Sequence, residues 1–177
     1  SRREIEKDIT NQAIDQVENS SKKLNSIVVF DSDWNKGVIG IVASRLVDKY
    51  YKPSVVFCES SEGFLTASAR SIKGLNLYSV MSKCKEYIDQ FGGHKYAAGL
   101  TIKKENLEGF KKRFENIVSQ TIDNNVFEQK LLIESKINLS EITPKFFRVL
   151  KASTGFNVTV LLAPIASRQL KLLLTVS

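Results

Sequence analysis

The sequence contains few of the residue types that bind transition metals. It has one histidine and two cysteines among 177 residues, and neither cysteine belongs to a CxxC pair. A zinc site therefore has few ligands to draw on. Cys58 and Cys84 lie in apolar-periodic segments, which predicts buried free thiols rather than a disulfide. Free thiols fit a reducing, cytoplasmic compartment.

Long apolar runs are missing as well. No stretch reaches the roughly 18 apolar residues that a membrane-spanning helix needs, so we expect none. The first four residues, Ser-Arg-Arg-Glu, run into a charged helical pattern, and we expect no signal peptide. The start at Ser1 rather than Met favours a piece of a longer protein.

Apolar and basic residues are plentiful. Hydrophobic residues make up 42% of the chain and charged residues 25%, which predicts a packed globular core rather than disorder. The 26 Lys and Arg exceed the 19 Asp and Glu, giving a net charge of +7. This excess favours polyanion partners such as nucleic acid, although a generic basic surface is the alternative.

The apolar periodicity predicts an α/β fold with a compact mixed sheet flanked by helices. A leading helix is predicted over residues 2–23. Strand, helix and strand then follow within a short span, as in a βαβ unit. The predicted strands are 26–30, 54–58, 64–70 and 100–102, and the predicted further helices are 38–50, 77–88 and 105–122.

The remainder of the chain predicts a β-rich tail. Residues 123–125 have the composition of a linker, and 130–137 alternate as a strand does. Thr143 and Pro144 predict the start of a helix over 143–151. The last 20 residues form short, strand-like apolar runs.

Three glycine- or serine-rich segments carry the candidate chemistry. In 37–45, two glycines lead into a helix, where free N–H groups can bind an anion; a turn with tight packing is the alternative. In 67–71, Ser68 and Arg70 lie two positions apart and point to one face of a strand. They form either a phosphate cradle or an edge-strand salt bridge.

The third segment, 92–99, holds three glycines and the only histidine. Such a stretch, predicted as a loop, leaves its backbone open to a ligand. His94 fits either a phosphate ligand or acid–base group, or a structural role. Asp31 and Asp33 are more typical of loop caps than of a cation site, because no further cluster of ligands completes a shell.

Together, in this order and spacing, these segments resemble the DHH-associated C-terminal domain of RecJ exonucleases, which belong to the DHH phosphoesterase superfamily. The likeness covers residues 1–150, and the leading helix resembles the family's connector from its catalytic DHH domain. The matching stretches are 37–46, Ser68-Ala69-Arg70-Ser71 with Asn76-Leu77, and 91–100.

The resemblance implies a 5′→3′ single-stranded-DNA exonuclease of DNA repair and recombination that uses Mn²⁺ or Mg²⁺. The family's metal ligands lie in an N-terminal domain, so we expect this fragment alone to be inactive and to bind no metal. By resemblance, Ser68 and Arg70 match residues that bind the 5′ phosphate. The other matched substrate-contacting positions are Arg45, Gly92, Gly93 and His94.

The resemblance also implies three parts: a connector helix over 1–24, a substrate-binding domain over 25–124 and an OB-like segment over 127–177. OB folds bind single strands through a basic groove and stacking. The family's Pro-Phe-Gly and Gly-Asn-Pro stretch does not follow Lys151, which predicts a partial or divergent OB fold.

Two other functions stay open. One is the substrate domain of a DHH-type phosphodiesterase for oligonucleotides or cyclic dinucleotides, whose members end soon after the Gly-Gly-His domain. The other is a non-catalytic repair module, for which single-strand-binding protein is the candidate partner. The roughly 50 residues after that domain favour the exonuclease, with single-stranded DNA as its ligand and no membrane partner.

Overall fold

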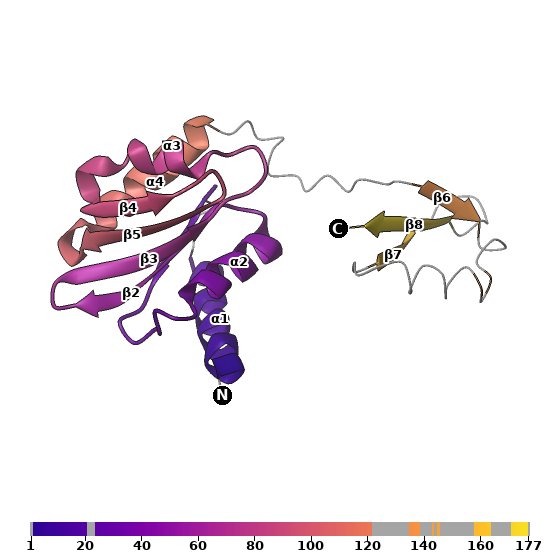
Figure 1. The fold of residues 1–177 in the computed structure, drawn as a ribbon, viewed down its shortest axis with the longest axis horizontal. Helices are drawn as coiled ribbons and strands as arrows, with labels where there is room; N and C mark the ends of the chain where they lie inside the picture. Colours follow the sequence, from indigo (N-terminus) through magenta and orange to yellow (C-terminus); the bar gives the residue numbers. More distant parts are fainter. Residues whose placement is uncertain are drawn as a thin grey trace. The chain divides into compact units, whose positions relative to one another are not determined.

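The computed structural model of the protein describes residues 2–20, 24–121, 135–138, 143, 145, 158–163 and 171–176. The chain divides into two compact units, Ser1–Gln129 and Lys130–Ser177. Figure 1 shows the helices and the larger sheet of the first unit and the three strands of the second.

The first unit is built on a mixed sheet flanked by helices, as predicted, but the sheet has five strands rather than the four expected. Its strand order is β1-β2-β3-β5-β4. Strands β1 and β2 are parallel and are joined by helix α2, which confirms the predicted βαβ unit, while every other pair is antiparallel. The elements are β1 (Ile27–Phe30), α2 (Ile39–Tyr50), β2 (Ser54–Ser61), β3 (Phe64–Arg70), β4 (Gln90–Gly93) and β5 (Ala97–Lys103).

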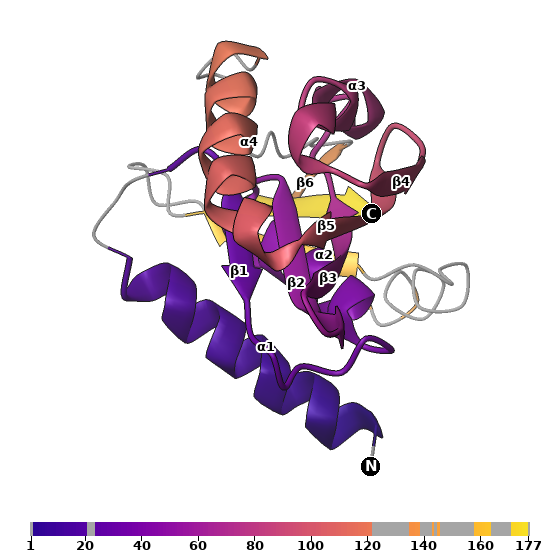
Figure 2. The same cartoon turned by 90° about the vertical axis from the view of Figure 1, so that its left-hand side faces the viewer.

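Helices cover the two faces of this sheet, because side chains alternate between the faces along each strand. Val55 and Phe57 of β2 pack in one core with α3 (Leu77–Ser82) and α4 (Leu107–Thr121). Val56 and Cys58 face the other core, with α1 (Arg2–Glu18) and α2. Figure 2 shows α3 and α4 above the strands and α1 below them.

Helix α2 covers only part of its face of the sheet. It packs on β2 and β3. Further across the same face, Gly99 of β5 and Gly92 of β4 are exposed. This open strip lies beside Ser68 and Arg70, which are half-buried on β3.

The structure corrects the prediction of a loop over residues 91–99. These residues form most of a β-hairpin, in which β4 pairs with β5 and β5 pairs with β3. Glycine is unfavourable in strands when judged locally. Here the pairing with β3 supplies the backbone hydrogen bonds that keep the segment extended.

Two predicted helices are shorter than their periodicity suggested. The helix expected over 77–88 stops at Ser82, and a separate 3-10 turn, η1 (Lys85–Tyr87), follows. The leading helix ends at Glu18 rather than at residue 23. Another 3-10 turn, η2 (Lys104–Asn106), precedes α4. None of the described helices is long and apolar enough to cross a lipid bilayer.

The second unit contains a three-stranded antiparallel sheet. Its order is β6-β8-β7, with β6 (Ser135–Asn138), β7 (Val158–Ala163) and β8 (Lys171–Val176). The strand predicted over 130–137 is confirmed in its described part. The expected linker lies outside the described residues, as does the helix over 143–151 except at Thr143 and Lys145.

Candidate functional site

The candidate site begins with two side chains of β3. Arg70 Nη1 donates to Ser68 Oγ at 2.9 Å and to the carbonyl oxygen of Ala69 at 2.9 Å. These bonds fix the direction of a half-buried guanidinium. Within the described part of the chain no carboxylate forms an ion pair with Arg70. The guanidinium therefore keeps donors for an outside acceptor.

The first turn of α2 lies directly against this pair. A Cβ atom on Gly40 would stand 3.1 Å from Arg70 Nη2 and 3.2 Å from Ser68 Oγ. No side chain caps the N-terminus of α2. The uncapped first turn of α2, an arginine and a serine hydroxyl thus meet at one place, and each carries hydrogen-bond donors.

Backbone without side chains continues across the sheet from Ser68. Ser68 pairs with Gly99 of β5, and Gly99 pairs with Gly92 of β4. A Cβ on Gly92 would meet nothing within 4 Å, and one on Gly99 only a carbonyl oxygen at 3.9 Å. We call Ser68, Gly99 and Gly92 the ledge. It is open enough for a ligand to lie against the strands.

The hairpin turn brings His94 to the same end of the sheet as Arg70. His94 N donates to Ala97 O at 2.8 Å, and Ala97 pairs with Arg70 across β5 and β3. The exposed imidazole has Nδ1 3.3 Å from the same carbonyl oxygen. Gly93 adopts a φ of +151°, and a Cβ there would lie 2.3 Å from Ala97 O, so the turn requires glycine.

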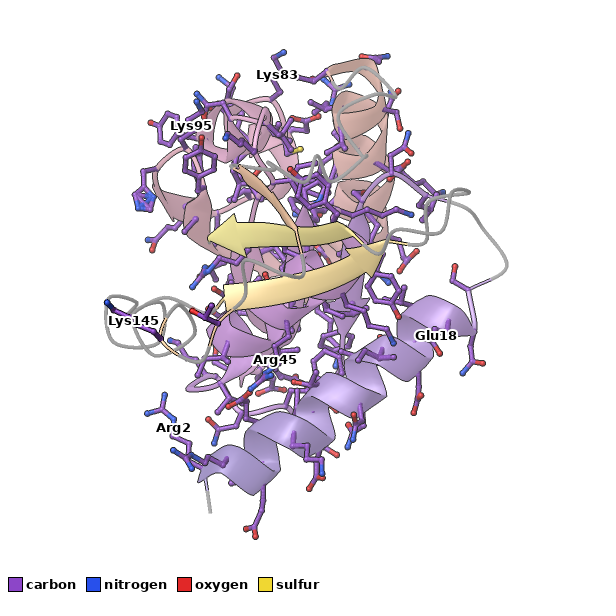
Figure 3. All side chains as sticks on the ribbon, turned by 90° about the vertical axis from the view of Figure 1, so that its right-hand side faces the viewer. Arg2, Glu18, Arg45, Lys83, Lys95 and Lys145 are labelled. Carbon is purple, nitrogen blue, oxygen red and sulfur yellow. The ribbon has the colours of Figure 1, made fainter. Side chains whose placement is uncertain are left out.

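Arg45 does not join this group. Its Nε forms an ion pair with Glu6 of α1. The two side chains line a hollow of about 270 Å³ between α1 and α2, together with Arg3, Lys7, Thr10 and Asn11. In Figure 3, Arg45 lies low beside α1, whereas Lys95 of the hairpin turn lies near the top of the unit.

Two members of the site were not among the predicted residues. Gly40 and Gly99 each belong to a segment that the sequence singles out. Their contribution depends on α2 lying over β3 and on the pairing of β5 with β3. The small residues at 97–99 indicated an open stretch of backbone. Their place beside Ser68 could be predicted only with knowledge of the strand that pairs with them.

The described residues do not fit a divalent metal. They contain no group of three or more His, Cys, Asp or Glu side chains that could hold one. Asp31 Oδ1 accepts from Asp33 N at 2.9 Å, and Ser32 Oγ donates to Asp33 Oδ1 at 3.3 Å. These are the contacts of loop caps, as expected.

Both cysteines are buried free thiols, which confirms that prediction. Burial raises the pKa of Cys84 to about 12 and also raises the pKa of Cys58. Thiols with such raised pKa values stay protonated and unreactive near neutral pH.

Comparison with known proteins identifies a domain family and several similar proteins. Residues 21–120 match the DHHA1 domain family. The single-stranded-DNA-specific exonuclease RecJ of Bacillus subtilis is 37% identical over 136 residues, which cover 76% of this chain and 17% of that protein. RecJ of Haemophilus influenzae is 33% identical over 159 residues, covering 85% and 28%.

Solved structures agree on the fold. The crystal structure of RecJ from Thermus thermophilus in complex with Mg²⁺ aligns with a TM-score of 0.71 and 23% identity, over 94% of this chain and 26% of that one. The chain therefore spans between 17% and 28% of the length of these proteins.

Proposed function

The chain belongs to the DHHA1 domain family, and from this premise we propose that it is the substrate-holding part of a 5′→3′ single-stranded-DNA exonuclease. Its similarity to two RecJ proteins, each described as a single-stranded-DNA-specific exonuclease, supports the substrate class. Such an enzyme would act in DNA repair and recombination. This chain matches 17% and 28% of the length of those two proteins, so the catalytic part would lie outside the matched region.

The packing of Gly40 against Ser68 and Arg70 carries the proposal. A terminal phosphate has several oxygens and needs donors from more than one direction. The guanidinium offers N–H donors, the serine a hydroxyl, and the first turn of α2 its backbone N–H groups. The close approach of the helix is possible because residue 40 has no side chain.

The ledge supports a polymeric substrate. Ser68, Gly99 and Gly92 run from the phosphate position to β4, which is the last strand of its sheet. A strand of DNA held at its 5′ phosphate can therefore leave along an open surface. His94, exposed near Arg70, is a candidate donor to a backbone phosphate. A closed pocket would suit a dinucleotide better.

We place the metal ions outside this chain. Because the described residues offer no cluster of ligands, the Mn²⁺ or Mg²⁺ of the proposed exonuclease would be held by another part of the protein. In this division of labour, the present chain fixes the 5′ phosphate and the strand, and it cleaves nothing by itself.

The test is the binding of short single strands with and without a 5′ phosphate. We expect the chain to prefer the phosphorylated strand, and Arg70→Ala to weaken that binding by about tenfold or more, because a charged hydrogen bond is lost. The affinity of Arg70→Ala for the 5′-hydroxyl strand should change little. Fluorescence anisotropy at fixed salt measures both affinities.

Arg113→Ala is the matched control. It removes a guanidinium from α4, where Arg113 pairs with Glu86 at 3.2 Å, and it changes the net charge equally. We expect its preference for the 5′ phosphate to equal that of the wild type. Equal losses in the two variants would mean that net charge, rather than a phosphate site at Arg70, governs binding.

A further inference from the structure

Two exposed tyrosines lie on the side of the sheet that faces away from the phosphate site. Arg70 of β3 pairs with Ala97 of β5, and one position further Ser71 N donates to Tyr96 O at 3.0 Å. Because side chains alternate along a strand, the Tyr96 ring lies on the side of α3 rather than on the side of α2. Tyr78 belongs to α3 itself. The two rings are 45% and 48% exposed, respectively.

A backbone hydrogen bond brings the two tyrosines close together. Leu77 N, at the start of α3, donates to Lys95 O in the hairpin turn at 2.9 Å. Tyr78 and Tyr96 are the residues that follow the two bonded residues. The Tyr78 ring packs against Phe91 of β4 at 5.4 Å, and Lys95 Nζ lies 5.3 Å from the centre of the Tyr96 ring. We call Tyr78, Tyr96 and Lys95 the aromatic surface.

The part of the chain that forms this surface is basic. Between residues 63 and 104 the only acidic residues are Glu86 and Asp89, and Glu86 pairs with Arg113 at 3.2 Å. In Figure 3, Lys83 and Lys95 both lie near the top of the unit. Four lysines of this stretch are exposed and form no ion pair with a described residue: Lys73, Lys83, Lys85 and Lys95. This excess of positive charge favours a polyanion.

The aromatic surface continues the ledge around the edge of the sheet. Gly92, the last residue of the ledge, is next to Phe91, on which Tyr78 packs. Strand β4, which holds both, is the last strand of its sheet. A DNA strand that crosses the ledge therefore passes over this edge and reaches the exposed rings on the other side.

We propose that the aromatic surface is a second contact for single-stranded DNA, where Tyr78 and Tyr96 stack on bases beyond the ledge. Lys95 contacts a phosphate beside these bases. Aromatic rings combined with unpaired cations are the usual means of holding a single strand, and stacking is tolerant of sequence because every base has a π face. The inference rests on the proposed substrate class, single-stranded DNA, but not on the phosphate site.

The test compares a 5′-hydroxyl oligothymidylate with an abasic strand of equal length and equal charge, so that the phosphate site contributes to neither affinity. In the full chain, Tyr96→Ala should weaken oligothymidylate binding about fivefold or more and leave abasic binding unchanged. Tyr96→Phe keeps the ring and should bind both strands as the wild type does. Phe64→Ala removes an exposed ring from the α2 side of β3 and should change neither affinity.

Tyr78→Ala is the second variant, and it should show the same selective loss. Its ring packs on Phe91, so circular dichroism must show that the variant is folded. Tyr96 has no aromatic partner among the described residues, and Tyr96→Ala decides alone if Tyr78→Ala is unfolded. An equal loss for both strands would mean that the rings do not stack on bases. No loss for either strand would mean that the surface serves another ligand, such as a protein. Both results would overturn the proposal.

The two proposals fail in different ways. If Arg70→Ala abolishes the preference for a 5′ phosphate while the tyrosine variants bind oligothymidylate as the wild type does, the phosphate site stands and the aromatic surface is refuted. If Arg70→Ala keeps that preference while the tyrosine variants lose affinity for oligothymidylate, the phosphate site is refuted and the aromatic surface stands. A chain that binds neither strand would refute the substrate class itself.

Discussion

Gly92 and Gly93 are neighbours in β4, yet the structure assigns them different roles. A Cβ on Gly93 would lie 2.3 Å from Ala97 O and 2.6 Å from Ala98 Cα, both of which are backbone atoms. One on Gly92 would meet nothing within 4 Å. We predict that Gly93→Ala lowers the free energy of unfolding by about 2 kcal/mol, because the hairpin must shift to relieve the clash.

Gly92→Ala serves as the control for this substitution. It adds the same methyl group to open space, and the free energy of unfolding should stay within about 0.5 kcal/mol of the wild type. Urea titration of the three proteins, followed by circular dichroism, measures the difference. Equal midpoints for the two variants would show that the turn does not depend on glycine at 93.

Single residues show where sequence reasoning succeeded and where it stopped. The alternation of β3 predicted that Ser68 and Arg70 share a face, and their hydrogen bond at 2.9 Å confirms it. Nothing in the spacing of α2 indicated that Arg45 would pair with Glu6, because that contact joins two helices distant in sequence. The glycines of 37–45 predicted an anion site or tight packing, but their spacing did not indicate that Gly40 would pack against Ser68 and Arg70.

At the scale of elements, one carboxylate ties α4 to the start of β1. Glu115 Oε2 accepts from Ser26 N at 2.9 Å and from Ser26 Oγ at 2.5 Å, while Oε1 accepts from Asn25 N at 2.9 Å. Ser26 is buried, so losing this partner leaves its polar groups unpaired. We predict that Glu115→Ala lowers the free energy of unfolding by about 2 kcal/mol.

Glu108→Ala is the comparison on the same helix. Its carboxylate is largely exposed and pairs with Lys111, one turn away. Removing it should change the free energy of unfolding by about 0.5 kcal/mol or less. Urea unfolding of both variants tests the claim. A similar loss in both would mean that the bonds to residues 25 and 26 contribute little.

The elements were predictable where the apolar pattern was strong and local. The strand over 64–70 has the predicted bounds, and the helix expected over 38–50 begins one residue later. The glycine-rich stretch was misassigned because its extended form depends on pairing with β3, a contact that local composition does not reveal. The apolar periodicity likewise did not predict the break in the helix over 77–88.

At the scale of the whole molecule, the core residues that the structure describes lie in the first unit. Both hydrophobic clusters of the described residues fall between Ile9 and Val118. The proposed phosphate site also draws only on this range. A chain of residues 1–129 therefore contains the packing that stabilises the five-stranded sheet and all the groups proposed to hold the 5′ phosphate.

We predict that this shortened chain folds and still prefers strands that carry a 5′ phosphate. Its thermal midpoint by circular dichroism should lie within a few degrees of the midpoint for the first unit in the 177-residue chain, because the core is unchanged. Its preference for a 5′ phosphate over a 5′ hydroxyl should equal that of the full chain and should vanish with Arg70→Ala. Longer strands should bind the full chain more tightly, because the OB-like segment predicted over 127–177 would add a second binding surface. A shortened chain that unfolds cooperatively yet ignores the 5′ phosphate would show that the site needs residues beyond 129.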